Sequence, residues 1–190
     1  EQTPNPESLK FVTNKMLYAG TADFRTRELA DEYSPLAAAL FDLPYVKSVY
    51  ICNNFVTLTK ELNYAWEDLM IRTKDFIKNY VAEEKPVILD GFAEAMTAAE
   101  DKRMSEINYS EDDGEMVKRI RELIDTYVKP AVEMDGGNIE FKSYHDGVVT
   151  LIMQGACSGC PSSTVTLKSG IEAMLKRMIP QVKEVVQEMA

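Results

Sequence analysis

The chain has 190 residues, of which 45% are hydrophobic, and 31 acidic against 21 basic residues give it a formal net charge of −10. This length fits one large or two small domains. The acidic balance argues against nucleic-acid binding, because the phosphate backbone favours clustered Lys and Arg, and against docking on anionic membranes. No stretch approaches the about 18 consecutive apolar residues of a membrane-spanning helix.

The negative charge is concentrated in the middle of the chain. Residues 81–114 contain 10 acidic and 3 basic residues, a surplus of seven negative charges. We therefore expect a first domain at 1–82, an acidic linker at 83–114 and a second domain at 115–190. Both domains mix helices with strands, so the expected class is α+β.

Local signals predict the elements of the first domain. Ser34-Pro35 is typical of a helix start, since Ser caps and Pro tolerates the first helical position. Asn53-Asn54 is a good hairpin turn. A later helix has an apolar face that includes Trp66, Met70 and Ile77. The expected elements are strands at 9–12 and 15–19, a helix at 36–41, strands at 46–51 and 55–59, and the helix around 66–81.

The second domain has the expected order helix, strand, strand, helix, strand. Apolar residues from Met116 to Val128, Tyr127 among them, repeat at helical spacing, and the helix is expected to run past Pro130 and end at Asp135-Gly136-Gly137. The expected strands are 139–144, 148–153 and 182–186. The second helix comes after a cysteine-containing loop and is expected to turn Val165 and Ile171 inward before Pro180 ends it.

The cysteines are the chemically informative residues. An odd, sparse set of three does not fit a disulfide-stapled secreted domain, so a reducing compartment is expected. Cys157-Ser158-Gly159-Cys160 lies between a strand and a helix N-terminus. Unpaired backbone N–H groups and the helix dipole favour a thiolate there, and two intervening residues let both sulfurs face one metal. Cys157 and Cys160 are therefore the candidate metal and cluster ligands, and no catalytic residue is expected.

Counting ligands turns the pair into half a site. Zinc and iron–sulfur clusters usually need four protein ligands, and this domain has two cysteines. His145 lies at the other end of a strand, about 17–20 Å from the pair at about 3.3 Å per residue, and Cys52 is expected to be an ordinary buried cysteine. Two chains meeting at their Cys loops would supply four thiolates, which predicts a homodimer around one labile, transferable cluster.

Three other interpretations of the pair remain open at this point. One is a thiol–disulfide oxidoreductase with Cys157 as nucleophile, although Pro161 comes after the pair instead of lying within it. Another is a zinc-bridged interaction module without chemistry, and the last is an inert pair.

Stretches in both domains resemble a known family. Asp135-Gly136-Gly137 and the run from Gly155 to Ser163 resemble the NifU-type C-terminal domain, as do Thr166–Glu172 and Ile179–Val182. The first domain is similar to the N-terminal domain of Nfu proteins. The stretches that match there are Thr3–Pro6, Leu9–Phe11, Ser34–Ala37 and Val46–Val49.

This resemblance implies an iron–sulfur cluster carrier. It implies that Cys157 and Cys160 bind a cluster that bridges two subunits. A [4Fe–4S] cluster is expected in preference to a [2Fe–2S] cluster. Implied partners are an upstream assembly scaffold and apo iron–sulfur proteins that receive the cluster. Cys52 has no counterpart among the family's ligands. We expect a bacterial cytoplasmic protein, with the mitochondrial matrix or a plastid as alternatives if a targeting segment has been removed.

Overall fold

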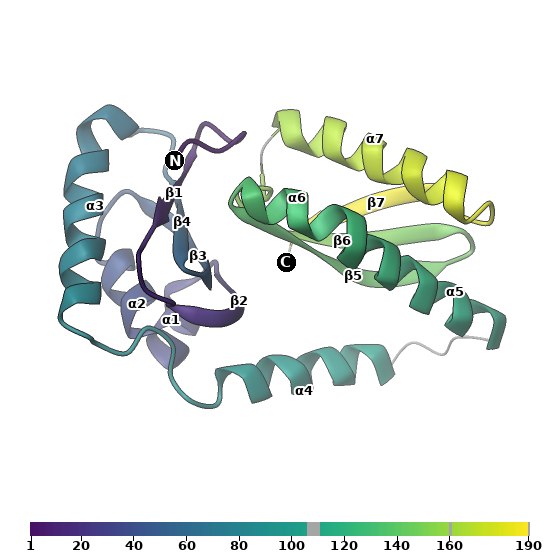
Figure 1. The fold of residues 1–190 in the computed structure, drawn as a ribbon, viewed down its shortest axis with the longest axis horizontal. Coiled ribbons are helices and arrows are strands. Elements are labelled where there is room, and N and C mark those ends of the chain that lie inside the picture. The colour runs from purple at the N-terminus through teal and green to yellow at the C-terminus, as the bar shows by residue number, and fades with distance from the viewer. Residues whose placement is uncertain (106–110, 160, 190) are drawn as a thin grey trace. The chain divides into compact units, whose positions relative to one another are not determined.

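The computed structural model describes residues 1–105, 111–159 and 161–189. The chain divides into two compact units, Glu1–Thr97 and Ala98–Ala190. Each contains helices and a sheet, which confirms the α+β class (Figure 1). The boundary falls in helix α4 (Phe92–Ser105), inside the segment expected to be a linker. That segment is thus helical at 92–105, and its limits at 83 and 114 stay a prediction.

The N-terminal unit is built on an antiparallel four-stranded sheet with the order β1-β4-β3-β2. Its three helices before α4 pack on one face of this sheet, over a core in which Val49, Ile51 and Leu58 are fully buried. Before α4 the elements are β1 (Ser8–Val12), β2 (Tyr18–Phe24), α1 (Arg27–Tyr33), α2 (Pro35–Phe41), β3 (Val46–Asn53), β4 (Phe55–Lys60) and α3 (Trp66–Ala82).

Capping and turn chemistry account for several of these boundaries. The Ser34 hydroxyl accepts a hydrogen bond from the Ala37 N–H, and Pro35 begins α2, as the sequence predicts. Asn53 ends β3 with a φ of 48°, in the left-handed region that Asn tolerates in tight turns.

Three expectations for this unit were wrong. The second strand spans Tyr18–Phe24 and not 15–19, and α1 was not expected at all. The signal for α1 is Thr26, whose hydroxyl accepts from the Leu29 N–H. Met70 is 48% exposed and lines the groove between β1 and α3 instead of packing in the core.

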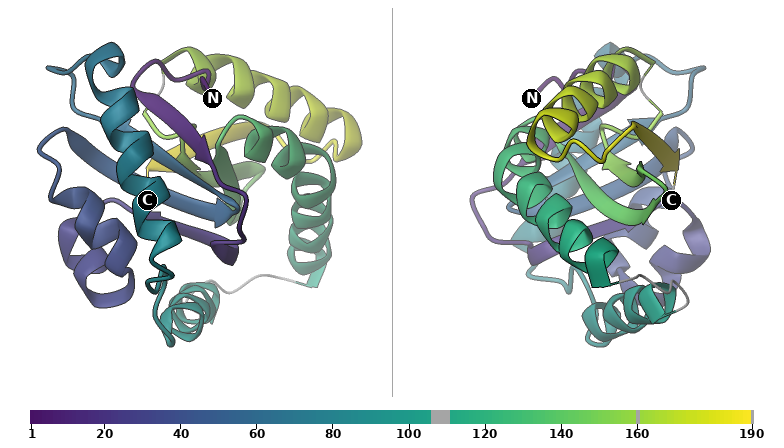
Figure 2. Two further views of the ribbon diagram at one scale, coloured as in Figure 1. Left: turned by 60° about the vertical axis from the view of Figure 1, so that its left-hand side comes forward. Right: turned by 90° about the vertical axis from the view of Figure 1, so that its right-hand side faces the viewer.

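The C-terminal unit has a three-stranded sheet with the order β5-β6-β7. The hairpin β5–β6 is antiparallel, whereas β6 and β7 are parallel because α7 connects them as a crossover. The helices lie together on one face, over a core that includes Ile120, Leu151 and Leu175 (Figures 1 and 2). After α4 the elements are α5 (Glu111–Leu123), η1 (Ile124–Val128), α6 (Lys129–Met134), β5 (Gly137–His145), β6 (Val148–Gly155), α7 (Pro161–Met178) and β7 (Glu184–Met189).

The first helix of this unit continues past Pro130, as predicted, through a π-helical turn at η1. Its end is also as predicted: Gly136 has a φ of 82° and donates its N–H to the Glu133 carbonyl at 3.0 Å. Tyr127 is 63% exposed, which corrects its expected place on the inner face, because a π turn adds a residue and changes which side chains face the core. Val165 is likewise exposed, at 67%, in the first turns of α7.

Candidate metal centre

The expected cysteine loop connects β6 to α7. Gly155 and Gly159 both have positive φ, 59° and 74°, so the backbone on either side of Cys157 turns in a conformation that favours glycine. Cys157 lies between them, and Pro161 begins α7. Cys160, the other candidate ligand, lies outside the described residues.

Three backbone hydrogen bonds hold the described part of the loop. The Cys157 N–H donates to the Gln154 carbonyl at 3.3 Å, and the Ser158 N–H donates to the Gly155 carbonyl at 3.1 Å. The Ala156 N–H donates to the Gly136 carbonyl at 3.2 Å, which ties the loop to the residue before β5. The described part of the loop therefore consists of two successive turns.

Cys157 is 5% exposed and belongs to the hydrophobic core of the C-terminal unit. Sequence reasoning expected a cluster at an open seam between two chains, and in the single chain this sulfur instead faces inward. A ligand that reaches a second chain must therefore turn out of the core before it can bind.

A polar cluster that the sequence did not suggest lies beside the loop. The Asn138 amide donates to the side-chain oxygen of Gln154 at 2.8 Å across the paired strands. On the same strand as Asn138, burial raises the pKa of the Glu140 carboxyl, and the negative charge of Glu100 raises it further, against the opposing effect of Lys129 and Arg103. Only the strand register, which places Asn138 opposite Gln154, could have revealed this cluster.

Glu172 anchors the helix that comes after the loop. Its carboxylate accepts from the Val185 N–H at 3.0 Å and from Lys176 at 2.6 Å. The hydrogen bond from Lys176 and then the one from Val185 lower the pKa of Glu172. A side chain of α7 therefore holds the outer edge of β7 and fixes the helix against the sheet.

The other residues weighed as ligands lie elsewhere. His145 is at the end of β5 where the hairpin turns, at the opposite end of β6 from Gly155, and its side chain is 89% exposed. Cys52 is buried in β3 of the N-terminal unit. Within the described part of the chain, no three or more His, Cys, Asp or Glu residues form a metal-binding group. A complete four-ligand site is therefore not found among the described residues.

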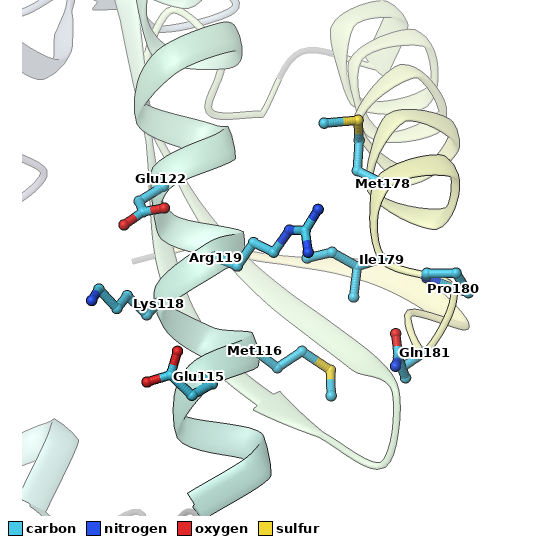
Figure 3. A pocket seen from close by; sticks show the side chains of 9 residues that line it. All are labelled: Glu115, Met116, Lys118, Arg119, Glu122, Met178, Ile179, Pro180 and Gln181. Atoms are coloured by element: carbon cyan, nitrogen blue, oxygen red, sulfur yellow. The ribbon is translucent and has the colours of Figure 1, made fainter.

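Two grooves lie away from the loop. One, of about 530 Å³, separates α5 from the segment after α7; Met116 and Arg119 face Ile179 across it, while Lys118 points away (Figure 3). The other, of about 950 Å³, lies between β1 and α3 in the N-terminal unit and is mostly apolar. Neither is lined by a cysteine or histidine, so neither competes with the loop as a cluster site.

Comparison with known families finds two matches in the same order as the two units. The family model described as "Scaffold protein Nfu/NifU N terminal" matches residues 1–84. The one described as "NifU-like domain" matches residues 120–186.

Relatives that match over nearly the whole chain have NifU-like or NFU1 names. "NifU-like protein 5, mitochondrial" of Arabidopsis thaliana is 42% identical over 99% of this chain and 66% of its own length. "NFU1 iron-sulfur cluster scaffold homolog, mitochondrial" of Homo sapiens is 40% identical over 100% of this chain and 70% of its own length. The Drosophila willistoni protein of the same name is 43% identical over 98% of this chain and 62% of its own length. The chain thus spans about two thirds of the length of these relatives.

Among the described residues, no helix is both long enough and apolar enough to cross a bilayer.

Proposed function

We propose that this chain, which belongs to the Nfu and NifU-like family, is an iron–sulfur cluster scaffold or carrier. In this proposal Cys157 and Cys160 of two chains hold one cluster, a [4Fe–4S] in preference to a [2Fe–2S], and pass it to apo iron–sulfur proteins. An upstream assembly scaffold would supply the cluster. The role requires binding and release of cargo but no catalysis.

The observation that carries the proposal is the loop at the start of α7. Thiolates are the usual ligands of iron–sulfur clusters, so the donor chemistry fits. Gly155 and Gly159 let the backbone turn sharply on both sides of Cys157, and a hydrogen bond from Ala156 to Gly136 joins this loop to the start of β5. In this proposal the loop rearranges to bring a sulfur to the surface, as reversible loading requires.

The incomplete ligand set supports a site shared between chains. Among the described residues, Cys157 belongs to no group of three or more His, Cys, Asp or Glu that could hold a metal, and a C2 dimer repeats every ligand of one chain in the other. A cluster held at such a seam is open to solvent and to a recipient protein, which suits transfer better than storage.

The relatives' names bear on the compartment. They call those proteins mitochondrial, which supports the mitochondrial alternative for this chain and does not support a bacterial cytoplasm. A reducing mitochondrial matrix also suits a chain whose conspicuous cysteines are a C-x-x-C pair.

Anaerobic reconstitution with iron and sulfide tests the proposal. We expect a broad absorption band near ~400 nm, from thiolate ligation of iron, and about one cluster per two chains at the mass of a dimer. A colourless protein with stoichiometric zinc would contradict it and favour the zinc-bridged module. Reduction of insulin disulfides with dithiothreitol as electron donor would instead favour the oxidoreductase.

A further inference from the structure

Gly137, the first residue of β5, lies directly against the candidate ligand. A Cβ atom built on Gly137 would lie 2.7 Å from the Cys157 sulfur, 2.8 Å from the Gln154 carbonyl oxygen and 3.0 Å from the Cys157 nitrogen. Carbon atoms pack at about 3.5–4.0 Å, so all three separations are too short for any side chain. The position therefore requires glycine for lack of space.

Backbone conformation does not impose this requirement. Gly136, Gly155 and Gly159 have positive φ, whereas Gly137 does not. Other amino acids can adopt an extended strand backbone without strain. A substitution at Gly137 thus leaves the local backbone preference intact and acts through the space around the Cys157 sulfur and the adjacent loop backbone.

The missing side chain leaves a recess that the sulfur fills. Gly137 pairs with Gly155 in the β5–β6 register, which sets the start of β5 beside the loop. The hydrogen bond from Ala156 to Gly136 fixes the same place from the other side. Within this frame Cys157 is only 5% exposed and packs into the core.

We propose that Gly137 is a positioning residue whose recess holds the Cys157 sulfur inside the cluster-free chain, sheltered from solvent until the loop turns it outward to take a cluster. The part about cluster uptake rests on the proposed function; the sheltering of the thiol does not. Sheltering would protect a ligand thiol from oxidation and alkylation while no cluster is bound.

The test measures alkylation of Cys157 by iodoacetamide in the reduced, cluster-free full chain. A Cys160→Ser background removes the neighbouring thiol, and peptide mass spectrometry reads Cys157 and Cys52 separately. Gly137→Ala should raise the alkylation rate of Cys157 by about tenfold or more, because a thiol displaced from the recess can react without a prior local opening of the chain. The Cys52 rate should stay unchanged, which controls for unfolding of the N-terminal unit, and far-ultraviolet circular dichroism checks that the C-terminal unit of the variant is folded.

Gly170→Ala is the matched control variant. Gly170 lies in α7 of the same unit, and nothing lies within 4 Å of a Cβ built on it. Its Cys157 rate should equal that of the parent chain. An unchanged Cys157 rate in a folded Gly137→Ala protein would overturn the proposal.

A double-substitution cycle separates positioning from simple destabilisation. If the sulfur is part of the clash, Cys157→Ala should restore part of the thermal midpoint that Gly137→Ala loses, and the two effects will not add. Strict additivity would mean that the sulfur does not occupy the recess.

A second measurement uses the chain with Gly137 intact, so it does not depend on whether Gly137→Ala folds. Cys157 in the Cys160→Ser chain should react about a hundredfold more slowly in buffer than in guanidinium chloride, as a sheltered thiol must. Equal rates would refute the recess. A sheltered Cys157 in a chain that never binds a cluster would refute the proposed function alone, so the two failures can be told apart.

Discussion

Cys52 and Cys157 are both buried, 1% and 5% exposed, yet the backbone around them is held very differently. Cys52 lies in β3, paired with Thr21 of β2 on one side and with Phe55 of β4 on the other. Cys157 lies in a loop of two turns, between glycines with positive φ. Strand pairing therefore holds Cys52 on both sides, whereas the described residues around Cys157 form turns.

This difference teaches that burial alone does not decide whether a cysteine can serve as a metal ligand. What matters is the number of backbone hydrogen bonds that must break to bring its sulfur outward. On this basis we expect the sulfur of Cys157, the proposed ligand, to reach the surface more readily than that of Cys52, which is part of the sheet.

The largest expected effect is on cluster binding. Cys157→Ser should abolish the visible absorption band and the cluster-dependent dimer, since it removes two of four thiolates from the shared site. Cys160→Ser should do the same. Iron and sulfide analysis after anaerobic reconstitution, with size-exclusion chromatography, measures both losses.

Cys52→Ser is the control variant, because it tests whether the buried Cys52, unlike Cys157, has no part in cluster binding. It should retain the full cluster while costing about 1–3 kcal/mol of stability for the buried hydroxyl. A loss of cluster in Cys52→Ser, at a temperature where the protein is folded, would show that the half-site argument is wrong.

The next effect concerns the strand that leads into the loop. Leu151 is fully buried in the middle of β6, and Leu151→Ala should cost about 2–5 kcal/mol through lost burial and the cavity left behind. Because β6 carries Gly155 and the loop, the variant should also lose its cluster to a chelator faster than the parent chain does.

Leu58→Ala is the matched change in the N-terminal unit, at an equally buried position of β4. It should destabilise its own unit by a similar amount and leave cluster retention unchanged. Denaturant unfolding monitored separately by visible absorption and by far-ultraviolet circular dichroism distinguishes the two. Equal cluster loss in both variants would mean that the site depends on the whole chain and not on its own unit.

Where a local signal determines an element, its position could be predicted from the sequence. Ser34-Pro35, Asn53-Asn54 and Gly136 each satisfy a cap or turn through their own chemistry, and each lies where expected. The helix α1 was missed because it spans only seven residues and its start is marked by the Thr26 cap without a subsequent Pro. Helix starts and turns could thus be predicted from the sequence where several local signals occur together.

The surroundings of Cys157 depend on long-range pairing and could not be predicted in this way. The pair itself was found from its spacing, but the inward direction of the Cys157 sulfur and the space beside it result from the register of Gly137 opposite Gly155. Residues 18 positions apart along the chain meet there because of the hairpin register. Tyr127 was misplaced for a related reason, because a single π turn changes which residues of a helix face inward.

The smallest expected effect tests how firmly α7 holds the loop in place. Glu172 has a lowered pKa in the folded chain, so its carboxylate stabilises the fold at and above its ordinary pKa of 4.5. That contribution is lost as the pH falls through the lowered folded value, where both states become protonated. Glu172→Gln should therefore lower the thermal midpoint by about 2 °C at neutral pH, and the difference should shrink progressively below pH 4.5.

Glu84→Gln is the surface control, since Glu84 pairs with Lys15 at 2.9 Å through a side chain that is 79% exposed. It should change the midpoint less than Glu172→Gln does, because water and salt screen an exposed pair. If Glu172 also limits the motion of the loop through α7, Glu172→Gln should raise the alkylation rate of Cys157 and leave that of Cys52 unchanged. If the difference in thermal midpoint between Glu172→Gln and the parent chain does not change with pH, the negative charge of Glu172 is not what anchors β7.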